Sequence, residues 1–268
     1  MATMQVQDVA SKTEKLVVEE AKNAPKMEAD ESEMEAKMKN EKPLDEQITK
    51  VSKEENGTPK EEEKPKEEVI AEEIEPKSGV SFPVKVADGK QLKTFGVRKK
   101  TLLGLGIKIY SFGLYADNER LQEIMKSDIK TAPAKPTKEM YQKVIDSDVG
   151  MMVRMVIVYG SLTMNMVKKS FDEGLGASIK KLNGGKKDDE LSTKVMAGAS
   201  DSIKLSPGSL IEISKLPGFV LETKVKGEVV SKVESELLCR AYINMYLGDD
   251  PFDKEAKEKF GVSLLSLF

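Results

Sequence analysis

The sequence predicts an α+β fold in which a large antiparallel β-sheet is covered by a layer of α-helices. Three observations lead to this prediction. Short β-prone runs are joined by tight turns, one long segment carries an apolar stripe at helical spacing, and the elements alternate as strands, helices, strand, helices, strands, helices. Tight turns connect antiparallel neighbours, and an amphipathic helix needs a layer against which to bury its apolar face.

An acidic segment precedes the part of the chain that we expect to fold. Residues 1–76 hold 22 acidic and 12 basic side chains, whereas residues 77–268 hold 24 acidic and 31 basic ones. No aromatic residue occurs between Ala10 and Pro76, so little apolar area is present to offset the entropy cost of ordering. We predict a disordered acidic tail over 1–76, with a partner-binding or regulatory arm as the alternative, and one folded ligand-binding domain over 77–268.

The composition excludes several classes of protein. There is no histidine, no tryptophan and one cysteine. Without histidine, neither a Ser-His-Asp nor a Cys-His catalytic arrangement can form. Zinc sites need several Cys or His ligands, so we expect no metal and no cofactor. No apolar run is long enough to cross a bilayer, and the small basic excess of the folded part is spread out, so we expect no stable membrane insertion and no nucleic-acid partner.

The first folded elements are predicted to be a hairpin and a long strand. Residues FPVKV and QLKTFGV flank Asp88-Gly89, a dipeptide typical of hairpin turns. After Arg98 comes the Gly-punctuated connection TLLGLG, and then IKIYSFGLYAD alternates as a strand. This alternation places four side chains on one face, namely Lys108, Tyr110, Phe112 and Leu114.

The middle of the chain contains the clearest predicted helix. Short helices are expected near ERLQEIMK and KEMYQKVID, and the β-prone run MMVRMVIVY predicts a central strand. Asn183-Gly184-Gly185 then marks the end of a long helix. Its apolar stripe consists of Met164, Val167, Phe171, Leu175, Ile179 and Leu182.

The last third predicts a meander followed by helices. A short helix is expected around DDELSTKVM, followed by three strands, SLIEISKL, FVLETKV and EVVSKVE. The turns Pro217-Gly218 and Lys226-Gly227 join these strands. Two helices, SELLCRAYINMYL and DKEAKEKFGVSLLSLF, complete the predicted elements.

An arginine and a tyrosine on neighbouring strands form the sharpest candidate site. Arg98 ends one predicted strand, and Tyr110 lies on the next. A guanidinium offers a carboxylate two parallel N–H donors and keeps its charge when partly buried, and a phenol adds one donor. Plainer interpretations stay open, because Arg98 belongs to a basic run that is typical of a solvated surface and a strand tyrosine most often packs in a core.

Three blocks of the sequence resemble the chalcone-isomerase-like fatty-acid-binding proteins of plants. They are FGVRKKTLLGLGIKIYSFGLYADNER, MMVRMVIVYGSLTMNMVKKSFDEGLG and VESELLCRAYINMYLGDDPFDKEAKEKF, in this order, within residues 77–268. By this resemblance the chain is identified as a member of the chalcone isomerase superfamily, of its fatty-acid-binding-protein type, with the third member as the most similar subgroup. The resemblance implies the chalcone-isomerase fold, an open-faced β-sandwich whose ligand cleft lies between sheet and helices.

The resemblance also implies a function and a site. In the fatty-acid-binding members an Arg and a Tyr hold the ligand carboxylate, and their motifs match Arg98 and Tyr110; a further ligand contact matches Gly174. The implied activity is non-catalytic binding of medium- to long-chain free fatty acids in an apolar cleft, in plastid fatty-acid metabolism.

The compartment is less directly indicated. The resemblance implies the chloroplast stroma. The N-terminal residues are acidic, unlike a transit peptide, and lack the apolar core of a secretory signal. We therefore expect the chloroplast by resemblance, with the cytosol as the alternative and a protein partner for the acidic tail.

The working isomerases of the superfamily differ from this chain in their polar residues. They also have the equivalents of Arg98 and Lys169, but they carry a Thr where this chain has Tyr110, a Tyr where it has Met166 and an Asn near Glu173. Where this chain has Met245 and Tyr246, they carry a Thr or Ser followed by an apolar residue. We therefore expect no enzyme. Two alternatives remain, a non-catalytic interaction protein that assists flavonoid-pathway enzymes and a residual chalcone-flavanone isomerase.

Overall fold

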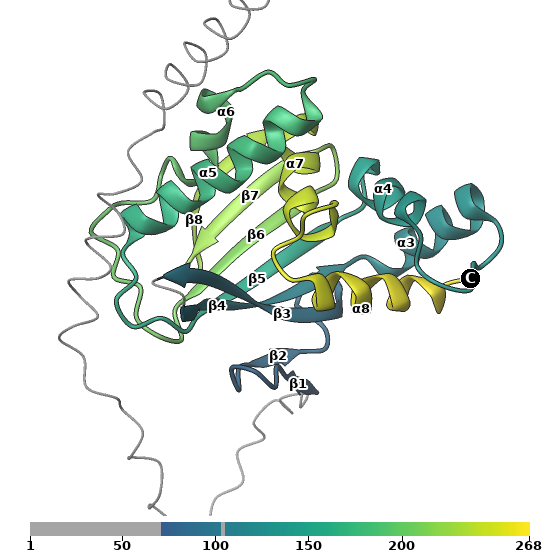
Figure 1. The fold of residues 1–268 in the computed structure, drawn as a ribbon, viewed down its shortest axis with the longest axis horizontal. Coiled ribbons are helices and arrows are strands. Elements are labelled where there is room, and N and C mark those ends of the chain that lie inside the picture. The colour runs from purple at the N-terminus through teal and green to yellow at the C-terminus, as the bar shows by residue number, and fades with distance from the viewer. Residues whose placement is uncertain (1–70, 103–104) are drawn as a thin grey trace, which may run out of the picture. The chain divides into compact units, whose positions relative to one another are not determined.

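The computed structural model describes residues 71–102 and 105–268. Within them the predicted α+β class is confirmed, since six strands form one antiparallel sheet in the order β3-β4-β5-β6-β7-β8 (Figure 1). A separate two-stranded sheet pairs β1 with β2. The strands are β1 Glu72–Ile74, β2 Ser81–Pro83, β3 Gln91–Leu102, β4 Leu105–Ala116, β5 Met151–Ile157, β6 Leu210–Leu216, β7 Val220–Val225 and β8 Glu228–Glu234.

Helices cover one face of the six-stranded sheet. Helices α5 and α7 pack together across this face, and α8 packs along the edge strand β3 (Figure 1). The helices are α3 Asn118–Ile124, α4 Lys138–Asp146, α5 Met164–Leu182, α6 Asp189–Thr193, α7 Glu236–Leu247 and α8 Lys254–Leu265, with a π-turn at Met125–Ile129 and a 3₁₀ turn at Lys194–Met196.

The core lies between this helical layer and the inward side chains of the sheet. Because side chains alternate along a strand, Phe112 and Leu114 of β4 point to the helices and are almost completely buried. The ring of Phe112 meets that of Tyr246 on α7 at a centroid distance of 5.1 Å. On the opposite face, the Ser111 hydroxyl donates to the Ser78 hydroxyl at 2.6 Å. Ser78 lies in the connection between β1 and β2, so this connection contacts β4 on that face.

The predicted long helix coincides with α5. Thr163 caps its first turn by accepting a hydrogen bond from the backbone N–H of Met166, and the residues that follow Leu182 end it. Gly184 and Gly185 have φ angles of +60° and +87°, which a residue without a Cβ adopts readily. Local sequence therefore sets both ends of the helix.

The predicted meander is also confirmed. β6, β7 and β8 are successive antiparallel neighbours. Lys226 and Gly227 have φ angles of +53° and +88°, the combination that a tight two-residue turn between antiparallel strands requires. β5 lies between β4 and β6, so its prediction as a central strand holds.

The β3 region differs from the prediction. The turn at Asp88-Gly89 exists, but it joins only a short paired stretch around Lys85 and Gln91, and the main partner of β3 is β4. The strand does not end at Arg98 either. It continues to Leu102, because Lys99, Lys100 and Thr101 extend the ladder to Lys108, Ile107 and Gly106 of β4.

The start of the folded part also differs from the predicted residue 77. Residues 1–70 of the predicted tail lie outside the described residues, but β1 falls within the predicted tail. Glu75 is buried, and its carboxylate accepts hydrogen bonds from the backbone N–H of Lys77 and the hydroxyl of Ser78. The pairing of β1 with β2 and the hydrogen bonds of the Glu75 carboxylate order residues 71–76, although these residues include no aromatic side chain. The folded part therefore begins at residue 71 or earlier.

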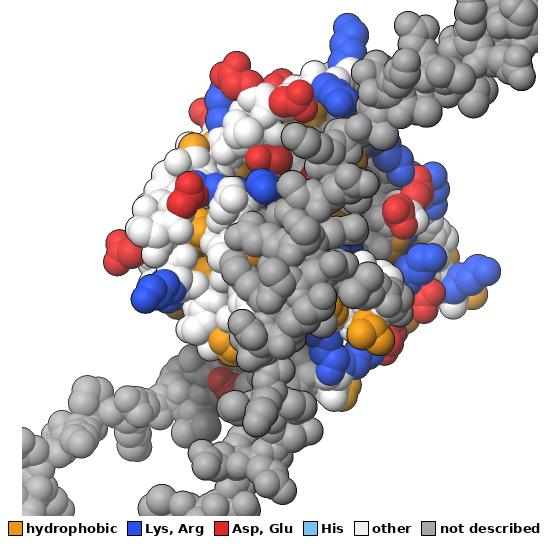
Figure 2. Space-filling view, turned by 60° about the vertical axis from the view of Figure 1, so that its left-hand side comes forward, with side chains coloured by type: hydrophobic (Ala, Val, Ile, Leu, Met, Phe, Trp, Pro, Cys, Tyr) orange, Lys and Arg blue, Asp and Glu red, His pale blue; other side chains and the backbone are white. Residues whose placement is uncertain are grey.

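Basic and acidic side chains are interspersed on the visible face of the described residues in Figure 2. Apolar side chains appear there as separate spots. The basic excess seen in the composition is therefore not gathered into one area of this face.

Candidate functional site

The sheet brings Arg98 and Tyr110 together. The two residues are directly opposite each other across β3 and β4. A shift in the strand register follows immediately, between Arg98 and Lys99. An irregularity of this kind bends the strand and changes the direction of a side chain. The pairing of Arg98 with Tyr110, expected from resemblance, is thus a property of the strand register.

The guanidinium of Arg98 has an aromatic partner instead of an acidic one. Its Cζ lies 3.8 Å from the centroid of the Phe252 ring, in the connection between α7 and α8. The side chain is half-buried. Among the described residues, no ion pair or hydrogen bond of the guanidinium is found. A partly desolvated cation without an acid is unusual, and its N–H edge is available to a ligand.

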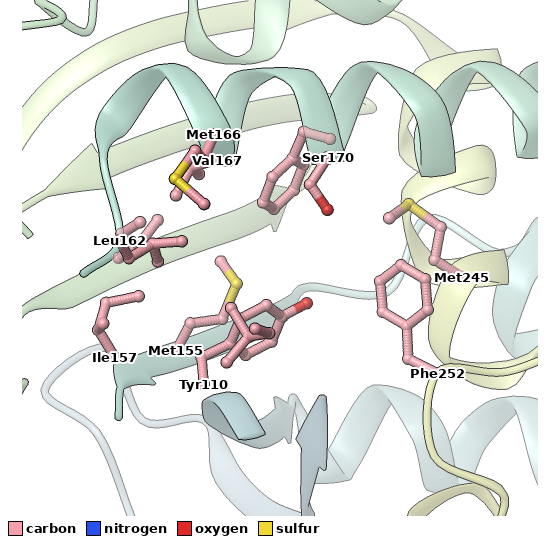
Figure 3. A pocket seen from close by; sticks show the side chains of 12 residues that line it. Tyr110, Met155, Ile157, Leu162, Met166, Val167, Ser170, Met245 and Phe252 are labelled. Carbon is pink, nitrogen blue, oxygen red and sulfur yellow. The ribbon is translucent and has the colours of Figure 1, made fainter. Parts of the chain in front are cut away.

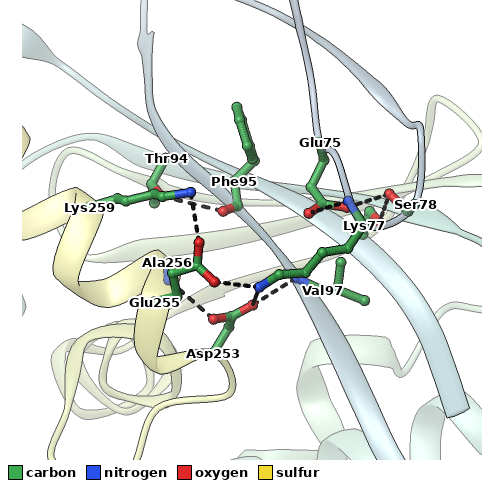
Figure 4. Close-up of polar contacts among 11 residues, drawn as sticks. Glu75, Lys77, Ser78, Thr94, Phe95, Val97, Asp253, Glu255, Ala256 and Lys259 are labelled. Atoms are coloured by element: carbon green, nitrogen blue, oxygen red, sulfur yellow. Dashed lines mark hydrogen bonds and ion pairs between the residues drawn. The ribbon is translucent and has the colours of Figure 1, made fainter. Parts of the chain in front are cut away.

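The acid that follows Phe252 in sequence is engaged elsewhere. Asp253 accepts hydrogen bonds from the backbone N–H groups of Val97 and Ala256, both at 3.1 Å, and lies 3.9 Å from the Lys77 ammonium (Figure 4). The first bond satisfies an N–H on the outer edge of β3, and the second caps α8. Asp253 therefore ties the Phe252 segment to β3 beside Arg98 without neutralising Arg98.

A narrow apolar cavity lies between the sheet and α5. The space that the centres of water-sized spheres can occupy is about 30 Å³, so a ligand would have to widen the cavity. Leu162 and Ile157 lie at one end, whereas Met245 and Phe252 lie at the other, toward which the Tyr110 hydroxyl is directed (Figure 3). The lining residues are Ile109, Tyr110, Met155, Ile157, Leu162, Met166, Val167, Ser170, Phe171, Ile211, Met245 and Phe252. The cavity is thus apolar along its length, with polar groups near the Phe252 end.

Tyr110 is a hydroxyl donor in this setting. Burial raises its pKa well above 10.0, the neighbouring Tyr246 hydroxyl raises the pKa further, and the charge of Arg98 opposes both effects. Burial likewise raises the pKa of Tyr246, whose hydroxyl donates to the Met155 sulfur at 3.9 Å. At neutral pH the Tyr110 hydroxyl therefore keeps its proton and can donate it to an anion.

The positions that the resemblance compares with those of isomerases fall in two places. Met166 and Met245, at which the resemblance implies hydroxyl-bearing residues in isomerases, line the cavity, and their thioethers make its wall apolar there. Lys169 and Glu173 are exposed on α5 and do not belong to the cavity lining among the described residues. The apolar character of the site expected from these replacements is consistent with this lining.

Gly174, the expected further ligand contact, lies behind the cavity wall. A Cβ at this position would be 3.3 Å from both the Met245 Cε and the Phe252 Cζ atoms. The absence of a side chain therefore lets α5 approach the Phe252 end closely. A ligand contact at Gly174 stays a prediction.

Phe252 and Ser170 are among the lining residues that the sequence did not single out. Phe252 carries a signal in retrospect, because it is an aromatic residue within the otherwise polar stretch DDPFD between two helices. Ser170 carries none, since a serine on the outer part of a helix is ordinary. In the structure its hydroxyl points into the cavity from α5 (Figure 3).

No helix of residues 71–102 and 105–268 is long and apolar enough to span a membrane. In the same residues, no group of three or more His, Cys, Asp or Glu side chains is arranged to hold a metal ion.

Comparison with known proteins identifies relatives of the chain. A family model described as chalcone isomerase-like matches residues 133–260. A protein of Humulus lupulus, chalcone isomerase-like protein 1, is 61% identical over 197 residues, which are 73% of this chain and 92% of the relative. Fatty-acid-binding protein 1 of Arabidopsis thaliana is 38% identical over 191 residues, 70% of this chain and 68% of the relative.

Solved structures agree with this assignment. The crystal structure of a fatty-acid-binding protein from Arabidopsis thaliana superposes with a TM-score of 0.69 at 36% sequence identity. The match covers 74% of this chain and 98% of the other. The predicted fold and its fatty-acid-binding type are therefore confirmed, and the assignment to the third member of that type stays a prediction.

The raised pKa of Tyr110 predicts a specific dependence of stability on pH. An unfolded tyrosine ionises near pH 10, whereas folded Tyr110 keeps its proton, so above that pH the unfolded state binds fewer protons and the free energy of unfolding falls. In Tyr110→Phe this fall should be shallower by up to about 1.4 kcal/mol per pH unit between about pH 10 and 11. Urea unfolding of the unaltered protein and of Tyr110→Phe measures the free energy of unfolding at each pH. The change from each protein's own value at neutral pH gives the two slopes to compare. Equal slopes would contradict the assigned environment of Tyr110.

Proposed function

The chain belongs to the chalcone isomerase-like family, and from this premise we propose that it binds a free fatty acid without catalysing a reaction on it. One observation carries the proposal. Arg98 is a half-buried cation with no acid partner among the described residues, and it contacts Phe252 and pairs with Tyr110, both of which line an apolar cavity. A fatty acid is a ligand with one anionic end and one long apolar part, which matches these two features.

The carboxylate has a defined place in this proposal. Its two oxygens would meet the N–H edge of Arg98, and one would also accept from the Tyr110 hydroxyl. Charge-assisted hydrogen bonds of this kind are stronger than neutral ones. They are needed, because a carboxylate that leaves water without a partner is strongly disfavoured.

The acyl chain would extend from Phe252 toward Leu162 and Ile157. Each methylene that leaves water contributes about 0.8 kcal/mol, so a twelve-carbon tail can offset the entropy cost of its own ordering. Three methionines, Met155, Met166 and Met245, line the path. Their unbranched, flexible side chains can move to widen a narrow cavity around a tail.

The relatives support the class of ligand. Two Arabidopsis thaliana relatives are named fatty-acid-binding proteins, and the superposed crystal structure is described as one. Medium- to long-chain free fatty acids are therefore the first ligands to test.

We place this binding in plastid fatty-acid metabolism, in the chloroplast stroma, with the cytosol as the alternative. A fluorescent fusion of the full chain should then colocalise with chlorophyll autofluorescence, and removal of residues 1–76 should show whether the tail directs it there. A diffuse cytosolic signal from the full chain would overturn the chloroplast assignment.

We further propose that the cavity does not isomerise chalcones. Met166 and Met245 present thioethers where a polyphenol would need hydroxyl groups to orient it. The absorbance of a chalcone should therefore fall at the spontaneous rate when the protein is added. A faster fall that saturates with chalcone concentration would contradict the proposal and favour residual isomerase activity.

Removing the Arg98 side chain tests the site directly. Arg98→Ala should weaken dodecanoate binding at least about tenfold, because hydrogen bonds to charged groups contribute about 1.5–3 kcal/mol each. Fluorescence displacement or calorimetric titration measures the affinity.

The matched control is Lys99→Ala, which removes an exposed cation one position further along the same strand. Its affinity should stay within about twofold of the unaltered protein, since exposed charges contribute little. Equal losses in the two variants would indicate a general charge effect, and an unchanged affinity in Arg98→Ala would remove Arg98 from the site.

A further inference from the structure

Phe252 stacks against Arg98 and also lines the cavity. The guanidinium Cζ is 3.8 Å from its ring centroid, and the same ring lines the end of the cavity to which the Tyr110 hydroxyl is directed (Figure 3). A distance this short places the flat cation against the face of the ring, where the electron density of the ring attracts it.

The two interactions of Arg98 use different parts of the guanidinium. The ring of Phe252 contacts its face, whereas a carboxylate binds in its plane, at the N–H edge. Stacking therefore leaves the donors for the ligand available. It also restricts a long side chain that would otherwise adopt many rotamers, so less conformational freedom is lost when a carboxylate binds.

Phe252 itself is held from several sides. Its backbone N–H donates to the carbonyl oxygen of Met245 at 3.0 Å, and its ring meets that of Tyr246 edge-on at 5.4 Å. Gly174 on α5 leaves room for the ring. The next residue, Asp253, is bound to the backbone N–H of Val97, which is the neighbour of Arg98 (Figure 4).

We propose that Phe252 is a positioning residue for Arg98: it holds the guanidinium by its face at the mouth of the cavity, so that the N–H edge is presented to the carboxylate of the ligand. The inference rests on the proposed fatty-acid binding and deepens it. Phe252 contributes to recognition of the charged end through Arg98, in addition to forming a wall for the tail.

The test compares two ligands of the same length, dodecanoate and dodecanol. Phe252→Leu keeps an apolar wall but removes the aromatic face. It should weaken dodecanoate binding about fivefold, the size expected of a cation–π contact at a partly exposed site, and change dodecanol binding by less than about twofold. Phe252→Tyr keeps the face and should retain dodecanoate affinity within about twofold. Equal losses for both ligands in Phe252→Leu would show that Phe252 is only a wall and would overturn the inference.

A matched control is present on β3. The ring of Phe95 lies 5.7 Å from the Lys259 ammonium, and neither residue lines the cavity. Phe95→Leu removes a similar contact and should leave the affinities for both ligands unchanged. In addition, Phe252→Leu should have little further effect on dodecanoate binding when combined with Arg98→Ala, because its action passes through Arg98. Additive losses would contradict this.

One measurement separates this inference from the proposed function. In lipid-free protein, the ring current of Phe252 should move the Nε–H proton resonance of Arg98 upfield of that of the exposed Arg120, and the displacement should vanish in Phe252→Leu. If dodecanoate does not bind the unaltered protein but the displacement is present, the proposed function fails while the Phe252–Arg98 contact stands. If the displacement is absent, the positioning role fails whatever dodecanoate does.

Discussion

Arg98 carries a charge that no acidic side chain of the described residues neutralises, and the surroundings of the cavity are arranged around this charge. Moving a guanidinium partly out of water is unfavourable unless other groups compensate for the lost hydration. Phe252 compensates at the face of the group, 3.8 Å away, whereas the N–H edge of Arg98 has no acceptor among residues 71–102 and 105–268. Asp253 is a candidate by proximity in sequence, yet it binds Val97, Ala256 and Lys77 instead. In our proposal, an anionic ligand completes the arrangement.

The rest of the fold determines where that ligand can go. The register of β3 and β4 places Tyr110 opposite Arg98, and burial keeps its hydroxyl protonated as a donor. Helix α5 covers the sheet beyond them and leaves an apolar cavity with flexible methionines in its wall. The polar end of the proposed ligand site therefore comes from the edge of the sheet, and its apolar wall comes largely from the layer of helices.

Features set by local sequence were predictable, and those set by distant contacts were not. The apolar stripe, Thr163 and the glycines after Leu182 define α5 without reference to other elements. Composition and turns also identify the meander. By contrast, the continuation of β3 past Arg98 depends on pairing with β4.

The candidate site divides in the same way. Arg98 and Tyr110 were weak candidates by residue type and became specific through resemblance to a family, since neither carries a local signal of ligand binding. Phe252 is separated from Arg98 by more than a hundred residues, and the packing of α7, the connection after it and α8 brings them together. The boundary at residue 77 failed for a related reason: Glu75 is ordered by hydrogen bonds within its own turn rather than by apolar content.

The central claim is that Arg98 is the anchor of an external carboxylate whose tail fills the cavity. A crystal structure of the protein with 12-bromododecanoate tests it most directly, because the anomalous signal of bromine locates the tail and the density locates the carboxylate. Our account predicts the carboxylate within hydrogen-bond distance of Arg98 and Tyr110, with bromine near Leu162 and Ile157. A carboxylate away from Arg98, or bromine outside the cavity, would contradict it.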